Sequence, residues 1–474
     1  MEYNRSARLD TEEGIKLITT KKKKDLTEGS IFKGMIAYAV PLMLTGLLQL
    51  FYNAADTVVV GQFSAEAETS LAAVGSTGSL TTLILNLILG LSAGTTVVVA
   101  QRYGSKDYEG VERAVHTSIA VSVIGGLFFA MIGFFGARVF LGLMDSPPDV
   151  IGKATLYMRI CFIGVPANVI YNFGSSILRA TGDTKRPLII LSTTGMINVL
   201  LNLLLVIVFH LDVAGVAIAT ITSQYLSAII IILILLNRND CLKLDLKKLS
   251  IHKETMLVIV RVGLPSGVQG CMFSISNVLI QSAVNSLPTA TIAGNTIAAN
   301  LGGFTYTVMN SFYQAELAFA GQNYGAKRQD RVNASLWIGL AQVAVVGFSF
   351  GMGELLLGRQ LAALYNSDPI IIEAAYYRMS MLLPTYFLCG MMEVMVGNLR
   401  GMGCSFVPML SSVFGACIFR SGWILIVFER LGTPFSLYIS YPISWLLTLV
   451  LHAITLAVVR SRHRTPSHEE GILQ

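Results

Sequence analysis

The chain has 474 residues, of which 53% are hydrophobic and only 13% are charged, and its mean hydropathy is +0.64. Soluble domains carry roughly 25% charged residues, so this composition excludes a soluble enzyme, a disordered protein and a nucleic-acid-binding domain. The formal net charge is +6, and the positions of the basic residues are more informative than this small excess.

Twelve apolar segments follow a polar N-terminal tail, residues 1–32. A membrane helix needs about 20 mostly apolar residues. Lipid offers no partner for free backbone groups, so each segment must be helical. The segments lie near 33–60, 71–100, 114–142, 153–178, 187–209, 213–236, 256–287, 291–320, 334–357, 372–398, 405–428 and 434–459. The sequence therefore predicts an all-α integral membrane protein with 12 transmembrane helices.

Basic residues predict how the chain is oriented, because cytoplasmic loops are enriched in Lys and Arg. With the N-terminus inside, 27 of the 34 Lys and Arg residues fall in the tails, in the inner loops or at the inner ends of the segments. We therefore expect a multi-pass protein of the plasma (inner) membrane with both termini cytoplasmic. The tail lacks the short apolar region of a signal peptide. It is expected to be solvated, with contact to anionic membrane lipid as the alternative.

The two halves of the chain resemble each other. Gln101-Arg-Tyr-Gly104 matches Gln322-Asn-Tyr-Gly325, and Leu178-Arg-Ala-Thr-Gly182 matches Leu399-Arg-Gly-Met-Gly403. In both cases the second copy lies 221 residues after the first, and this distance is called the repeat offset. Six helices separate the copies, an even number, so the repeats are parallel and related by an axis along the membrane normal. The predicted parts are a first lobe (33–236), a cytoplasmic linker (237–255), a second lobe (256–459) and a cytoplasmic C-terminal tail (460–474).

Two glycine pairs have GxxxG spacing, Gly90 with Gly94 and Gly321 with Gly325. Small residues at this spacing let two helices approach closely. We therefore expect these glycines to pack helices together.

Asp56 lies inside the first apolar segment, well beyond Pro41 in the same segment. An ionisable residue at the bilayer centre costs about 2.5–3.5 kcal/mol, which makes it a candidate functional group. Tyr52 and Asn53 precede it by four and three positions and share its helix face. We expect Asp56 to bind a proton or a cation, and a hydrogen-bonded structural acid is the alternative. The matching position of the second half is Ile280, so this acid belongs to the first lobe alone.

Paired amides supply a complement to this acid. Asn198 and Asn202 are one helical turn apart in the fifth segment, and each carries both donors and acceptors. Hydrogen bonding between helices is the alternative role. In the seventh segment, Asn277 occupies the position that matches Asn53.

Three further carboxylates lie in or near apolar segments of the second half. Glu393 matches Asn172 at the repeat offset, which predicts an inward-facing polar position in each lobe. A Glu393 paired with an arginine or with the backbone is the alternative. Glu316 either faces the substrate cavity or reaches the membrane interface, and Glu354 is expected to pair with Arg359 at the outer end.

Motifs for chemistry are missing. The sequence contains neither GxxxxGK[ST] nor HExxH, so it predicts no ATPase, no metal centre and no cofactor. The protein is therefore expected not to be an enzyme, and its transport energy must come from an ion gradient or a partner.

The sequence resembles the multidrug and toxic compound extrusion (MATE) family of efflux antiporters, bacterial type. The resemblance rests on five stretches: Pro41…Asp56–Gly61, Gly94–Gly104, Leu178–Asp183, Ala214–Thr220 and Gly321–Ala326. It implies a V-shaped pair of six-helix lobes around a central cavity that lies within one chain, so we expect a functional monomer. It also implies export of organic cations and amphiphilic drugs in exchange for H⁺ or Na⁺.

The resemblance also assigns candidate residues. Asp56 matches the coupling aspartate of the first lobe, and the polar neighbours of that site match Tyr52, Asn198, Thr220 and Tyr157. The sequence departs from the family at Asn202, where many relatives carry a second acid, and H⁺ and Na⁺ coupling both stay open.

Two alternatives remain. A lipid-linked oligosaccharide flippase of the same wider fold group should place several Arg or Lys inside the cavity, whereas only Arg420 falls well within a span. A channel or receptor-like membrane protein is the other alternative, and the internal repeat and Asp56 argue against it.

Overall fold

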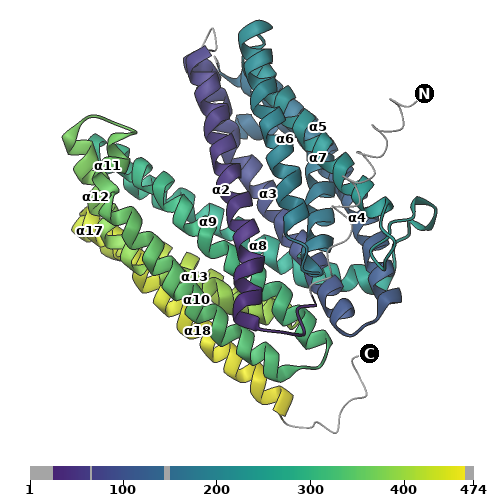
Figure 1. The fold of residues 1–474 in the computed structure, drawn as a ribbon. Coiled ribbons are helices and arrows are strands. Elements are labelled where there is room, and N and C mark those ends of the chain that lie inside the picture. Colours follow the sequence, from purple (N-terminus) through teal and green to yellow (C-terminus); the bar gives the residue numbers. More distant parts are fainter. Residues whose placement is uncertain (1–24, 64–66, 144–149, 465–474) are drawn as a thin grey trace, which may run out of the picture.

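A computed structural model describes residues 25–63, 67–143 and 150–464, and the regular elements in these ranges are all helical (Figure 1). The first half contains α2 (Ile31–Phe63), α3 (Ala67–Gly104), α4 (Tyr108–Leu143), α5 (Ile151–Ala180), α6 (Lys185–Leu203), the π-helical turn η1 (Leu204–Val208) and α7 (Asp212–Leu236). The second half follows the short 3-10 turn η2 (Leu246–Lys248). It contains α8 (Lys253–Asn285), α9 (Thr289–Gly325), α10 (Gln329–Leu356), α11 (Gly358–Ala363), α12 (Pro369–Leu382), η3 (Leu383–Thr385), α13 (Tyr386–Gly401), α14 (Phe406–Ser412), η4 (Val413–Ile418), α15 (Phe419–Trp423), η5 (Ile424–Phe428), α16 (Glu429–Leu431), α17 (Pro434–Tyr438) and α18 (Ser440–Arg464). The predicted all-α class is confirmed.

Eleven helical segments of the described chain are long and apolar enough to span a membrane. The remaining predicted span corresponds to α9, which is 37 residues long and exceeds the length that a bilayer requires. Polar residues interrupt its apolar character, and Asn295, Ser311 and Glu316 among them are buried inside the protein.

The two halves touch at one end and spread apart at the other, which gives the predicted V shape (Figure 1). They touch mainly where α3 packs along α8 and α9. At this crossing Gly90 and Gly94 face Gly267 and Gly263, and a Cβ on Gly90 would lie 2.1 Å from the backbone nitrogen of Gly267. The expected packing role of the Gly90/Gly94 pair is confirmed.

The predicted parallel repeat is visible in paired backbone and side-chain geometry. Gln101 Nε2 donates to the Gly401 carbonyl at 2.8 Å, and Gln322 Nε2 donates to the Ala180 carbonyl at 2.6 Å. Gln322 is the repeat counterpart of Gln101, and Gly401 is that of Ala180, so the two bonds are the same contact made twice. An approximate two-fold axis therefore passes between the halves where they touch.

The turns that follow α5 and α13 also repeat. Gly182 has a φ of +87° and Gly403 has a φ of +88°. This left-handed conformation is strained for a residue with a Cβ, so glycine is needed at both places. The sequence motifs thus mark turns that end two equivalent helices.

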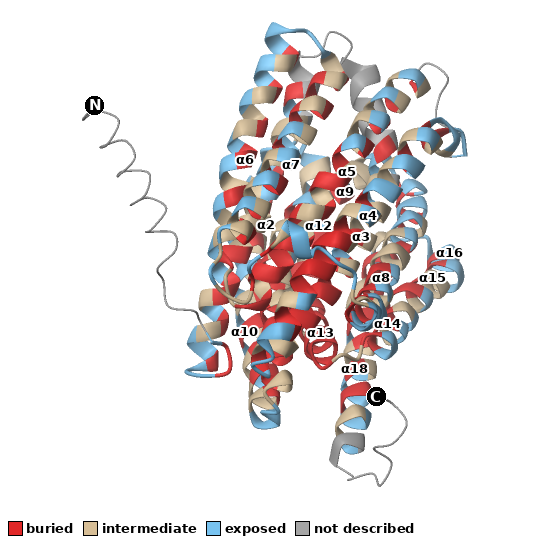
Figure 2. Ribbon diagram, turned by 90° about the vertical axis from the view of Figure 1, so that its right-hand side faces the viewer, coloured by how far each residue is buried: buried red, intermediate tan, exposed pale blue. Residues whose placement is uncertain are grey.

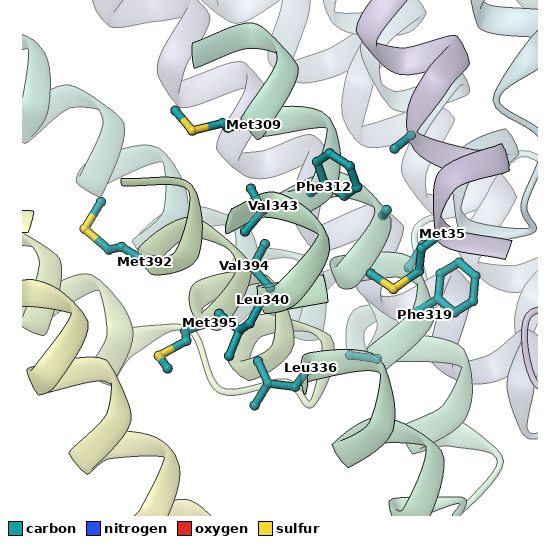
Figure 3. Close-up of a cluster of buried hydrophobic side chains, with 14 of the residues drawn as sticks. Met35, Met309, Phe312, Phe319, Leu336, Leu340, Val343, Met392, Val394 and Met395 are labelled. Atoms are coloured by element: carbon teal, nitrogen blue, oxygen red, sulfur yellow. The ribbon is translucent and has the colours of Figure 1, made fainter. Parts of the chain in front are cut away.

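Buried residues concentrate around α3, α9 and α13 (Figure 2). The largest apolar cluster joins α2, α9, α10 and α13, and Figure 3 shows Met35 of α2 beside Phe319 of α9. Tyr38 also meets the Phe319 ring edge-on, with 6.2 Å between ring centroids. The first part of α2 therefore packs against the second half, although its sequence position belongs to the first.

The described end of the N-terminal tail is bonded to the second half, although only Leu26 and Thr27 of residues 25–30 are buried. Leu26 is buried, and its backbone nitrogen donates to Gln322 Oε1 at 3.1 Å. Arg331 donates to the carbonyls of Leu26, Glu28 and Gly29. These bonds fix the chain against the second half directly before α2 begins, while residues 1–24 lie outside the described residues.

Candidate functional site

A cavity of about 480 Å³ lies between the two halves. Helices α2, α3, α5, α6 and α7 line it from the first half, and α8, α9 and α13 line it from the second. Seven of the predicted site residues lie on its wall: Tyr52, Asn53, Asp56, Asn172, Asn198, Thr220 and Glu393. The cavity therefore brings together polar residues from both halves that are far apart in the sequence.

Asp56 belongs to a short chain of polar side chains that connects three helices. Asn202 Nδ2 donates to Asp56 Oδ1, and it also lies 3.4 Å from Asn198 Oδ1. Asn198 Nδ2 in turn donates to Thr220 Oγ1 at 3.4 Å. The chain therefore runs from α2 through α6 to α7.

The surroundings of Asp56 leave its charge without a cationic partner in the described chain. Its hydrogen-bond partner is the neutral amide of Asn202, and no basic side chain forms an ion pair with it. Asn202 is fully buried, and the π-helical turn η1 begins directly after the helix that carries it. Such turns occur frequently at functional sites. A half-buried carboxylate that faces a cavity with a neutral partner can accept a proton or a small cation.

The two predicted tyrosines have different positions. Tyr52 lies on the cavity wall, where its hydroxyl donates to the Ser192 carbonyl at 3.2 Å and its ring fills the space beside Gly195. Tyr157 does not lie on the wall. Tyr52 thus shapes the cavity beside Asp56, whereas Tyr157 does not border the cavity.

Glu393 and Asn172, which occupy matching positions of the repeats, both face the cavity. Asn172 Nδ2 donates to the carbonyl and side-chain oxygens of Asn168, each at 2.9 Å. Glu393 is buried and feels the charge of Arg400 two turns further along α13. Glu393 and Arg400 do not form an ion pair with each other in the described structure, so the carboxylate of Glu393 is available to a ligand.

Two residues that were predicted for the cavity do not lie on its wall. Glu316 is fully buried inside the second half, where Oε1 accepts from Asn398 Nδ2 at 2.5 Å and from Ser335 Oγ at 2.9 Å. Asn277 is exposed on α8. Neither side chain is placed to contact a molecule in the cavity.

The predicted pair of Glu354 with Arg359 is wrong. Glu354 accepts a hydrogen bond from Thr305 of α9, whereas Arg359 pairs with Glu373 at 2.6 Å. Glu354 is buried and points toward α9, while Arg359 lies beyond the end of α10 on the short helix α11. The break between the two helices separates residues that are close in the sequence.

Sequence reasoning missed two arginines on the cavity wall, Arg179 and Arg400. Arg420, the arginine that the span boundaries singled out, is buried elsewhere and donates to Ser444 Oγ at 2.6 Å. The signal that could have found the pair was the repeated Leu-Arg motif, because Arg179 and Arg400 match at the repeat offset. The expectation of a cavity poor in arginine is therefore corrected.

Comparison with known proteins places this chain among transporters. The family model described as MatE matches residues 41–204 and 265–421. The chain is 26% identical over 405 residues to the probable multidrug resistance protein YoeA of Bacillus subtilis, covering 84% of this chain and 86% of that protein. It is 20% identical over 378 residues to the multidrug export protein MepA of Staphylococcus saprophyticus, covering 79% and 83%.

The fold is also similar to that of a solved structure, a multidrug resistance MATE family transporter of the MOP superfamily in its outward-facing conformation. The TM-score is 0.87, with 21% sequence identity and coverage of 93% of this chain and 99% of that one. At this identity the likeness shows a common fold.

Proposed function

The chain belongs to the MatE family of multidrug efflux transporters, and on that premise we propose that it is a secondary antiporter. It exports organic cations and amphiphilic drugs in exchange for inward H⁺ or Na⁺. The observation that supports this proposal is the position of Asp56, a carboxylate that faces the shared cavity with only a neutral amide as its described partner.

The geometry of Asp56 suggests how exchange is coupled. The Asn202 amide stabilises the charged carboxylate by donating a hydrogen bond to it. A proton or a Na⁺ ion neutralises the same carboxylate, so it competes with a cationic substrate for one negative charge. Competition for one site is sufficient for exchange, provided that the cavity opens to the two sides in turn.

The proposed orientation determines which end of the V-shaped molecule faces the cytoplasm. If both termini are cytoplasmic, the end where α2 begins and the halves touch is the cytoplasmic end, and the halves spread apart toward the outside (Figure 1). Alternating access then requires the contact of α3 with α8 and α9 to open while the outer ends approach. Because the cavity lies within one chain, a monomer in the plasma membrane suffices.

Transport by purified protein in liposomes tests the proposal. The liposomes are loaded with a fluorescent organic cation, and a pH gradient or a Na⁺ gradient is imposed separately. Movement that depends on one of the two gradients would support antiport and identify the coupling ion. Absence of movement under both gradients, with protein shown to be folded and inserted, would count against the proposal.

Glu393→Gln is expected to change which cations are exported rather than whether the protein folds. Glu393 is the cavity carboxylate of the second half, and its removal takes away one charge that cationic groups can approach. A lost charged hydrogen bond costs about 1.5–3 kcal/mol, which corresponds to roughly tenfold or more in affinity for the cations that use it. Drug resistance of cells that express the variant measures this range.

Glu354→Gln provides the matched control for Glu393→Gln. Glu354 is also a buried carboxylate of the second half, but it bonds Thr305 and does not lie on the cavity wall. Unchanged resistance to every cation in the Glu393 variant would contradict a role in the cavity. A loss that the Glu354 variant shares to the same extent would point to damaged folding.

The flippase alternative gains one observation from the structure. Two arginines line the cavity, whereas the sequence suggested that it had none apart from Arg420. A polyanionic lipid-linked substrate would need such residues. The cavity also contains two carboxylates, Asp56 and Glu393, which would repel a polyanion, and antiport therefore remains the proposal.

A further inference from the structure

Arg179 and Arg400 occupy equivalent places at the end of the cavity where the halves touch. Each lies in the last turn of its helix, α5 or α13, one residue before a carbonyl that receives the repeated glutamine bond. Both contribute to the wall of the same cavity. The two-fold relation of the halves therefore puts one guanidinium on each side of the axis.

The described partners of both arginines are neutral. Arg400 donates to the Tyr313 hydroxyl at 2.7 Å and to Gln269 Oε1 at 2.8 Å. Arg179 donates to Ser176 Oγ at 2.9 Å. In the described part of the chain, no carboxylate forms an ion pair with either guanidinium. A buried charge without an opposite charge is costly, and in a membrane protein it marks a functional position.

Each guanidinium group also has one N–H donor without a hydrogen-bond partner among the described residues. The Nε atoms of Arg179 and Arg400 are buried and have no hydrogen-bond partner among the described residues. Arg400 as a whole is only 5% exposed, so bulk water does not compensate it. An oxyanion would satisfy these donors and would supply the ion-pair partner that both guanidinium groups lack among the described residues.

The charges along the cavity are separated rather than mixed. Glu393 precedes Arg400 by two helical turns on α13, which is about 10 Å of helix. Asp56 lies on the last third of α2, far from the start of that helix at the contact end. The cavity therefore carries positive charge at the contact end and negative charge further out.

We propose that Arg179 and Arg400 form a subsite for the carboxylate of an amphiphilic substrate, at the end of the cavity where the two halves touch. This inference rests on the proposed function in one respect, namely that the cavity is the substrate site. The planar guanidinium donors match the two oxygens of a carboxylate. Leu42, Phe273 and Tyr306 line the same cavity and provide apolar and aromatic surface for the rest of the molecule.

A matched pair of dyes isolates the carboxylate. Rhodamine 110 has a free carboxyl group, and rhodamine 123 is its methyl ester, so the two share one cationic ring system. Equilibrium binding of both dyes to the purified full-length protein is measured by fluorescence anisotropy without any gradient. Wild-type protein is expected to bind the acid more tightly than the ester.

The variants Arg179→Gln and Arg400→Gln should each weaken binding of the acid by about tenfold or more, with little change for the ester. Arg179→Lys keeps the charge and should retain most of the affinity. Arg378→Gln is the matched control, because Arg378 is a buried arginine that donates to the Asn295 carbonyl and does not lie on the wall. It should leave both affinities unchanged.

Equal binding of acid and ester in wild type, unchanged by either arginine variant, would overturn the subsite. Asp56→Asn separates this result from a failure of antiport. That variant should change the affinities for acid and ester by a similar factor, so the preference for the acid is kept even if all gradient-driven transport is lost. Binding of the acid that is lost equally in the Asp56, Arg179 and Arg378 variants would show general damage and would also overturn the proposal.

Thiol labelling decides the question if neither dye binds. In a cysteine-free background, Ser175→Cys places a thiol on the wall one turn before Arg179, and Asn53→Cys places one beside Asp56. Anionic and cationic methanethiosulfonates are compared at each position. The subsite predicts a relative preference for the anionic reagent at 175 that falls in the double variant Arg179→Gln/Arg400→Gln. An unchanged ratio would refute it.

Discussion

Asp56→Asn is expected to reduce gradient-driven efflux of organic cations to the level of empty liposomes. Asparagine has almost the same shape, and its side-chain oxygen can still accept the hydrogen bond from Asn202. The substitution removes only the charge and the ability to bind a proton or Na⁺. Transport in liposomes under a pH gradient and under a Na⁺ gradient measures the effect.

The large expected loss of efflux follows because no other carboxylate of the first half lines the described cavity and could replace Asp56. The matching position in the second half is Ile280, and the neighbouring residue that hydrogen-bonds Asp56 is the neutral Asn202. Among the described wall residues, Glu393 is the other carboxylate, and it belongs to the second half. Wild-type efflux by Asp56→Asn would therefore refute the coupling role outright.

Glu354→Gln is the matched control for this experiment too. It removes a carboxylate from the interior without touching the cavity, and the remaining oxygen can still accept from Thr305. Normal amounts of folded Asp56→Asn protein, together with normal efflux by Glu354→Gln, would assign the loss to the cavity charge. Poor folding of Asp56→Asn would instead favour the structural role for this acid.

Much of the fold followed from spacing in the sequence. The repeat offset that the two motifs share predicted two parallel halves, and the reciprocal bonds of Gln101 and Gln322 show why this motif appears twice. Helical periodicity also placed Tyr52, Asn53 and Asp56 on one face, and all three line the cavity. Both patterns are local or repeated, so they can be read without knowledge of packing.

Asn277 shows where the repeat misleads. It matches Asn53 in sequence, yet Asn53 faces the cavity and Asn277 is exposed on α8. The helices that carry them have different neighbours, because α8 packs mainly along α3 whereas α2 packs against both α6 and α9. Duplication of a sequence therefore does not guarantee that each side chain keeps its environment.

The arginines on the wall were missed because hydropathy alone sets the boundaries of a predicted span. The predicted fourth and tenth spans end at 178 and 398, which left Arg179 and Arg400 to the loops. In the structure α5 extends to Ala180 and α13 to Gly401, and the cavity reaches their last turns. A small shift at a helix end thus changes the predicted charge of the site.

Gly90→Ala is expected to lower the melting temperature and to reduce efflux. The added Cβ would lie 2.1 Å from the backbone nitrogen and 2.3 Å from the Cα of Gly267, and backbone cannot move aside as a flexible side chain can. Helices α3 and α8 must therefore separate at their crossing. Overpacking of this kind costs about 1–3 kcal/mol, which exceeds the roughly 0.5–1 kcal/mol that alanine gains over glycine in a helix.

Gly125→Ala is the matched control for Gly90→Ala, since Gly125 is also inside a long helix and a Cβ there meets nothing within 4 Å. It should leave efflux unchanged and raise the melting temperature slightly. Because α3 and α8 belong to different halves, the clash at Gly90 acts on the contact that opens in the proposed alternating access. A Gly90 variant that matches the Gly125 variant in both stability and transport would show that the halves need not touch closely here. A variant that is unstable but still transports would separate the packing role of the glycine from the transport cycle.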